Sequence, residues 1–147
     1  MPPPPDHLGS LPARALSDAE LAALRAPYET LIGFVPPRIM ARTELGARLD
    51  PDLLRLQEAA RLHAMYPACF DVKTSQLMLF GILLALMGDA ARLHAIAARR
   101  AGASWEELSA VVGLAYLFRG LPAANLGAEI LQKMAEAEGG AAAPSQP

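Results

Sequence analysis

The stretch KTSQLMLFGILLALMGDAARLHAIAARRAGASWEELSAVVGLAYLFRGLPAAN, residues 73–125, decides the fold. Its first part is apolar nearly all round up to Met87, and Gly88 interrupts it. After Ser104 the apolar residues recur at spacings of three and four, which is typical of one apolar face on a helix. No segment alternates apolar and polar residues as a half-buried strand does. The stretch therefore predicts consecutive helices and no sheet.

Capping signals extend the same pattern upstream. Ser17 with Glu20, and Ser104 with Glu107, have the spacing of a capping box at a helix start. Asp50 precedes a proline that suits the first helical position, and Asp71 precedes the apolar segment. We predict an all-α protein of about six or seven helices.

The 147 residues fit a single domain over 16–137, between a proline-rich disordered tail (1–15) and a flexible tail (138–147). Expected ends within this domain are Met87 for the apolar helix and about Ala137 for the last one. Asp89 is a candidate cap for the short helix between them, and Gly102 a left-handed glycine that ends it.

Composition and charge exclude several classes of function. The net charge of −2 is spread along the chain, so we expect no nucleic-acid partner. Leu77–Met87, the most apolar run, is far shorter than the ~20 residues of a membrane helix. The lone Cys69 allows no internal disulfide and suits a reducing compartment, so we expect a cytoplasmic location. An apolar share of 53% is high for a small domain and favours surface buried between subunits.

Three features resemble the core of the carboxymuconolactone decarboxylase / AhpD-like superfamily. They are the Lys73–Thr74 helix start, a helix with His94 before an AGAS turn, and the closing GLPAAN at residues 120–125. LIGFVPPRIM, residues 31–40, is similar to the N-terminal part of the peroxidase-related members. The resemblance implies an AhpD-like helical bundle that assembles as a homotrimer or homohexamer, with sites near subunit boundaries.

The chain departs from that family's reactive motifs. Peroxidase members carry a Glu, then Cys-x-x-Cys, then a His. Gln76 stands here at the Glu position, and Met87 and Ala90 at the two Cys positions. Hydroperoxide reduction through a thiol pair is therefore disfavoured. Decarboxylase members carry a Glu one turn before the His, where this chain has Ala90 and, next to it, Asp89, an alternative acid/base or a helix cap.

His94 is the candidate catalytic residue, because an imidazole titrates near neutrality and can return a proton to a carbanion. The alternative is a packed histidine with one hydrogen bond. Arg119 and Arg92 are candidates to hold a substrate carboxylate through paired donors. Arg119 is equally explained by the helix dipole, and Arg92 by a solvated face. Further candidates for substrate contact are Gln76, Asn125 and His63.

Three functions stay open on the sequence. The first is a cofactor-independent lyase or isomerase acting on a small carboxylated lactone or enol, with no metal and no cofactor expected. The second is a catalytically silent oligomer that binds a ligand or a partner. The third, a peroxidase using Cys69 alone, is disfavoured, since Cys69 is most simply a small buried apolar residue.

Overall fold

A computed structural model describes residues 1–2 and 9–142, with the side chains of 140–142 left out. Over that part of the chain there are seven helices and no strand, which confirms the all-α prediction. The helices are α1 (Asp18–Ile32), α2 (Pro37–Leu49), α3 (Pro51–Met65), α4 (Val72–Ala85), α5 (Ala91–Arg100), α6 (Trp105–Arg119) and α7 (Leu121–Ala142).

The expected helix starts are present as hydrogen bonds. Both capping boxes form, at Ser17–Glu20 and at Ser104–Glu107. The Asp71 carboxylate accepts from the Thr74 backbone N–H at 2.6 Å and caps α4. Because these caps satisfy backbone donors that a helix start leaves unpaired, they fix where α1, α4 and α6 begin.

The segment between α4 and α5 differs from the expectation. Helix α4 ends at Ala85, and Met87, not a glycine, takes the left-handed conformation (φ 55°). The N–H groups of Met87 and Gly88 bond back to Leu84 and Leu83, which closes the helix end. The prediction that Asp89 caps α5 is wrong: the N-cap is Ala90, with no side-chain cap bond. Gly102 has the expected positive φ of 98°.

Both expected tails are shorter than predicted. Pro12 accepts from the Arg48 guanidinium and Ala15 donates to Ala47, so residues 12–15 are tied to α2. At the other end α7 continues to Ala142, and Glu138 pairs with Arg99 of α5 at 3.0 Å. Residues 3–8 and 143–147 of the two predicted tails lie outside the described residues.

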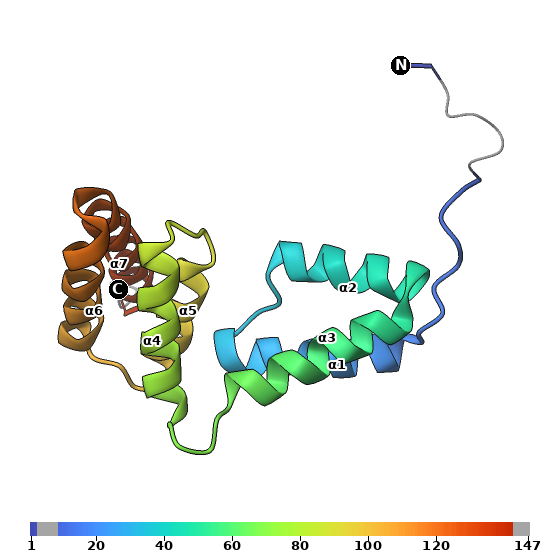
Figure 1. Cartoon of the computed structure of the whole chain (residues 1–147), viewed down its shortest axis with the longest axis horizontal. Helices are drawn as coiled ribbons and strands as arrows, with labels where there is room; N and C mark the ends of the chain where they lie inside the picture. Colours follow the sequence, from blue (N-terminus) through green and yellow to red (C-terminus); the bar gives the residue numbers. More distant parts are fainter. Residues whose placement is uncertain (3–8, 143–147) are drawn as a thin grey trace, which may run out of the picture. The chain divides into compact units, whose positions relative to one another are not determined.

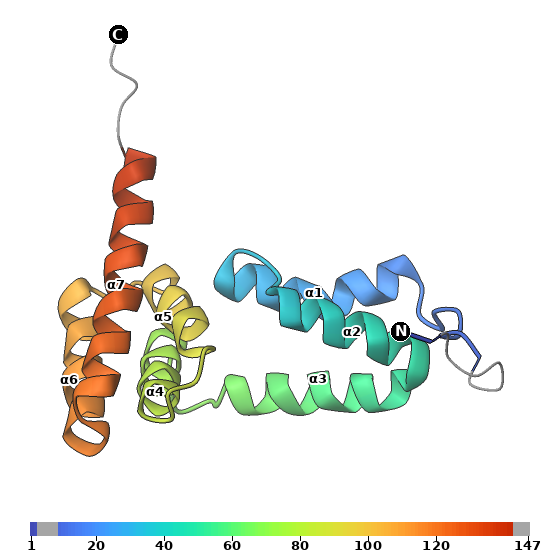
Figure 2. The same cartoon turned by 90° about the horizontal axis from the view of Figure 1, so that it is seen from above.

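The chain divides into two compact units, unit 1 (Met1–Ala64) and unit 2 (Met65–Pro147). In unit 1, α1, α2 and α3 run alternately up and down (Figures 1 and 2). Its apolar core is Leu16, Leu21, Ala47 and Leu54. Tyr28 and Arg42 both hydrogen-bond to the carboxylate of Glu58, which is only 3% exposed. The carboxylate of Glu58 is thus part of the interior of unit 1.

Unit 2 contains α4 to α7 and a larger core. Phe80 and Leu84 of α4 are fully buried against alanines of α5, Leu108 of α6 and Ile130 of α7. The alanines let α5 approach α4 closely, while α7 extends past the other helices of the unit (Figure 2). Within the described residues, no helix is both long and apolar enough to cross a bilayer.

Candidate active site

The site that the structure assembles is a pair of side chains between α4 and α5. His94 Nδ1 lies 2.7 Å from Oε1 of Gln76, a hydrogen-bond distance. Gln76 is fully buried, and His94 is half-buried. Two predicted site residues separated by eighteen positions in the sequence therefore meet in unit 2.

Met65 fixes the orientation of the Gln76 amide. Gln76 Nε2 lies 3.1 Å from the thioether sulfur of Met65, the last residue of α3 and the first of unit 2. A thioether only accepts, so the amide nitrogen points to Met65 and the amide oxygen points to His94. An amide oxygen also only accepts, so His94 Nδ1 must donate. In the neutral ring the proton then resides on Nδ1, and Nε2 is the basic nitrogen.

A helix cap near Gln76 and small residues near His94 determine where the two side chains lie. Gln76 follows the Asp71 cap by little more than one turn, on the face of α4 that also buries Phe80. On α5, Ala91, Ala95 and Ala98 are fully buried, so the helix packs with little side-chain bulk between it and α4. His94 lies next to this alanine face. A buried amide without a partner would be costly, and the His94 bond removes that cost.

A comparison with known families shows which family the chain belongs to. A model of the carboxymuconolactone decarboxylase family matches residues 51–133, which is more than half of the chain. The chain belongs to the carboxymuconolactone decarboxylase family. No curated protein and no solved structure matches it. The family match spans α3 to most of α7 and includes both members of the pair.

In this member of the carboxymuconolactone decarboxylase family, the arginines and the asparagine that were predicted to bind substrate lie elsewhere in unit 2. Arg92 lies on the α7 side of α5, where it lines a cavity of about 240 Å³ with Arg99 and Lys133. Arg119 is exposed in the last turn of α6, and Asn125 is exposed on α7. The predicted contacts of these residues with a substrate stay predictions.

Two further candidates are also at the surface. His63 is exposed in the last turn of α3, in unit 1. Asp89 is exposed in the segment between α4 and α5. Their predicted roles in substrate contact and acid/base chemistry stay predictions.

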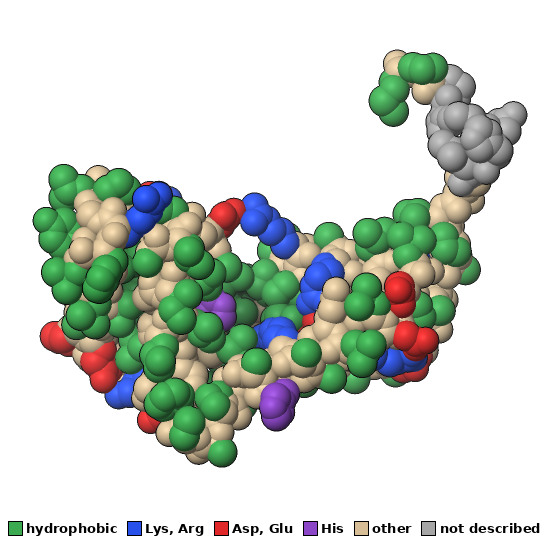
Figure 3. Space-filling view, in the orientation of Figure 1, with side chains coloured by type: hydrophobic (Ala, Val, Ile, Leu, Met, Phe, Trp, Pro, Cys, Tyr) green, Lys and Arg blue, Asp and Glu red, His purple; other side chains and the backbone are tan. Residues whose placement is uncertain are grey.

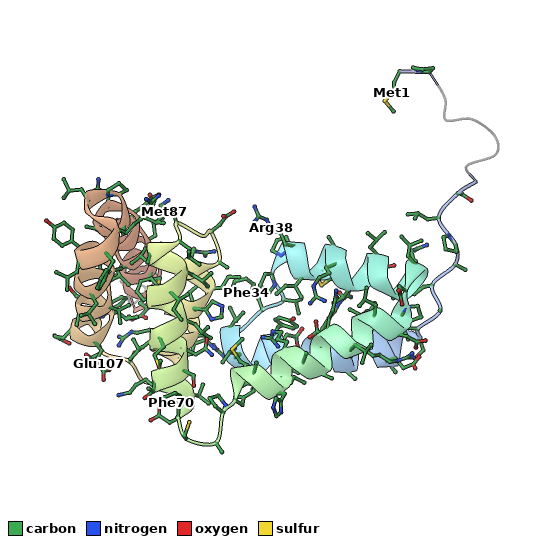
Figure 4. All side chains as sticks on the ribbon, in the orientation of Figure 1. Met1, Phe34, Arg38, Phe70, Met87 and Glu107 are labelled. Atoms are coloured by element: carbon green, nitrogen blue, oxygen red, sulfur yellow. The ribbon has the colours of Figure 1, made fainter. Side chains whose placement is uncertain are left out.

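The positions that carry thiols in peroxidase members are occupied by other groups here. Met87 packs against the core of unit 2, and Ala90 is the N-cap of α5. Figure 4 shows Met87 at the end of α4. Cys69 is exposed, so the expectation that it is a small buried residue is wrong. It lies in the short connection between α3 and α4, which has little core to enter.

Sequence reasoning missed Met65 and the polar cluster of unit 1. Met65 belongs to no sequence motif, and only its contact with the Gln76 amide shows that it orients this side chain. In unit 1, Arg61 stacks over the Tyr28 ring at 3.7 Å, and burial is the main cause of the raised pKa of the Tyr28 hydroxyl. Glu58 and Arg61, one turn apart on α3, were the available signal. In the described part of the chain, no group of three or more His, Cys, Asp or Glu side chains could hold a metal ion.

Proposed function

We propose that this carboxymuconolactone decarboxylase family protein is a cofactor-independent lyase or isomerase with His94 as its general acid/base. The observation that carries the proposal is the 2.7 Å contact between His94 Nδ1 and the buried Gln76 amide oxygen. A base held in one tautomer by a buried neighbour is the arrangement that proton transfer requires. Family membership favours a small carboxylated lactone or enol as substrate.

The chemistry follows from the tautomer. The Nε2 lone pair removes a proton from a carbon acid, or the protonated ring returns one to the carbanion left when carbon dioxide departs. The electron pair must be delocalised into the substrate, for example into an adjoining enone. Gln76 is neutral, so unlike a carboxylate it does not add a negative charge that would favour the imidazolium form. Nε2 is then the ring nitrogen that exchanges the proton with the substrate.

The test is hydrogen exchange into substrate candidates in D₂O. Purified protein is incubated with a panel of small carboxylated lactones and enones, and deuterium uptake and carbon dioxide release are followed by NMR. We expect exchange with at least one compound, and a loss of about 10²–10⁴-fold for His94→Ala. Far-UV circular dichroism checks that the variant is folded. Turnover retained by His94→Ala would contradict the proposal.

Two variants that replace a glutamine by glutamate, one inside the site and one outside it, test whether Gln76 acts on His94. Gln76→Glu places a carboxylate beside Nδ1, which favours the charged ring, so the limb of the pH profile that reports His94 moves to higher pH. Gln132→Glu makes the same change on the exposed face of α7 and leaves the profile unmoved. Equal profiles for all three proteins would remove Gln76 from the mechanism.

The second candidate is a silent ligand-binding protein. It is favoured by one observation, the neutral Gln76 beside His94 at the position where peroxidase members carry a Glu. It predicts that compounds of the panel shift the NMR signals of His94 but exchange no deuterium above the rate in buffer. That result would replace the catalytic proposal.

A further inference from the structure

A cavity between α5 and α7, within unit 2, is lined by four cationic side chains, Arg92, Arg99, Arg100 and Lys133. Its volume is about 240 Å³, and Glu138 is the one carboxylate among the described residues that line it. Figure 2 shows α5 and α7 side by side, whereas the face of unit 2 seen in Figure 3 is mostly apolar. Positive charge is therefore concentrated along the α5–α7 cavity.

Ion pairs within the protein compensate two of the four cations. Arg99 donates to both oxygens of Glu138, at 3.0 and 3.1 Å. Lys133 pairs with Glu129, one turn earlier on α7. The other two, Arg92 and Arg100, are exposed, and their side chains make no ion pair or hydrogen bond with any residue that the structure describes. The cavity thus keeps two positive charges to which an anion could bind.

The helix dipole accounts for only part of this cluster. Arg99 and Arg100 lie in the last turn of α5, where the negative end of the dipole favours a cation. Arg92 is the second residue of α5, at the positive end of the dipole, and the first turn contains no acidic side chain. The charge of Arg92 therefore opposes the stability of its own helix. Positions that break such a local rule are expected at functional sites.

The two uncompensated arginines lie at the two ends of one face of α5. Arg92, Ile96 and Arg100 follow one another at intervals of four residues, so they share that face, and Arg92 and Arg100 are separated by about 12 Å along the helix axis. Ile96 lies midway between them, and the buried Met134 of α7 also lines the cavity. An apolar wall with a few charged groups is typical of a small-molecule site.

We propose that this cavity binds a small, elongated dicarboxylate. One carboxylate bonds to Arg92 and the other to Arg100, each through paired guanidinium donors, while the apolar middle of the ligand lies on Ile96 and Met134. A volume of 240 Å³ is that of about eight water molecules, which suits an alkyl chain such as that of suberate and excludes a nucleotide. His94 bonds toward α4, whereas these arginines face α7, so the ligand is separate from any substrate of the His94–Gln76 pair.

The test is isothermal titration calorimetry of the full chain with three probes. Suberate has two carboxylates at the required separation, octanoate has only one, and succinate is too short to reach both arginines. We expect suberate to bind at least about 10-fold more tightly than either of the others. Arg92→Gln and Arg100→Gln should each weaken suberate binding by about 5- to 10-fold. Arg55→Gln, on the exposed surface of α3, removes the same charge and should leave the affinity unchanged.

Methyl NMR shows where the ligand binds. Saturating suberate should shift the methyl signals of Ile96 and Met134, and circular dichroism checks that every variant keeps its helices. Any of four results would overturn the proposal: no binding of suberate, equal affinity for octanoate or succinate, an Arg55→Gln variant weakened as much as the two α5 variants, or unshifted Ile96 and Met134 signals.

Discussion

The side chain of Gln76 determines which nitrogen of the His94 ring carries the proton. A fully buried amide that is oriented by Met65 leaves only the oxygen for the imidazole, and so determines which ring nitrogen carries the proton. The same histidine beside a carboxylate would favour its charged form. The residue at position 76 therefore determines the tautomer of the neutral His94 ring.

Met87 is the second residue with an unusual environment. In the described part of the chain it is the one non-glycine residue at positive φ. This conformation costs an L-residue about 1–2 kcal/mol. We therefore expect Met87→Gly to be more stable than Met87→Ala by about 1 kcal/mol in urea unfolding, since both variants lose the same packing. At Ala110, exposed inside α6, glycine should instead destabilise by about 0.5–1 kcal/mol. Equal stability of the two Met87 variants would show that the backbone at position 87 leaves the left-handed conformation when the side chain is replaced.

At the scale of elements, glycine lets α7 approach α4 and α6. A Cβ at Gly127 would lie 2.6 Å from one Val112 methyl group and 3.1 Å from Leu84. Gly127→Ala should cost about 1–3 kcal/mol, because a packed core cannot absorb the methyl group. Gly113→Ala is the control, since nothing lies within 4 Å of its added Cβ on α6. It should gain about 0.5–1 kcal/mol through helix propensity. A Gly127→Ala variant as stable as the wild type would mean that α7 is less tightly packed against α4 and α6.

The starts of α4 and α6 are joined by an ion pair that also belongs to a cap. Glu107 accepts from Lys73 through one oxygen and from the Ser104 N–H through the other (Figure 4 labels Glu107). The Lys73 bond, followed by the Ser104 bond, lowers the pKa of Glu107, and the Glu107 bond raises the pKa of Lys73. A lowered carboxyl pKa contributes stability above the unfolded value, which is lost as the pH falls through the folded value. The lysine contribution is lost only as the pH rises through its raised pKa.

Glu107→Gln tests this link. Glutamine keeps an oxygen for the capping box but carries no charge. Between pH 6 and pH 3, which spans the ordinary carboxyl range, we expect the variant to lose less stability than the wild type in urea unfolding. Glu107→Ala, which also removes the cap, should be the least stable of the three at pH 7. Parallel pH profiles for wild type and Glu107→Gln would show that the pair contributes nothing measurable.

At the scale of the whole molecule, local signals predicted the fold and left the site incomplete. Caps at Ser17, Asp71 and Ser104 act within four residues, so the sequence alone places these helix starts. The Gln76–Met65 bond depends on the path of the chain from Met65 into α4, within unit 2, and no spacing encodes it. For the same reason, the positions of Arg92 and Arg119 away from the pair emerge only from the packed helices.

The most direct test of the central claim is the tautomer and titration of His94. Long-range ¹H–¹⁵N NMR of the full chain distinguishes a proton on Nδ1 from one on Nε2, and repeating it with small mono- and dicarboxylates tests the site for ligands. The account predicts a neutral ring protonated on Nδ1 that titrates and shifts when one of these compounds binds. A proton on Nε2, or a ring that neither titrates nor responds to any of them, would contradict it.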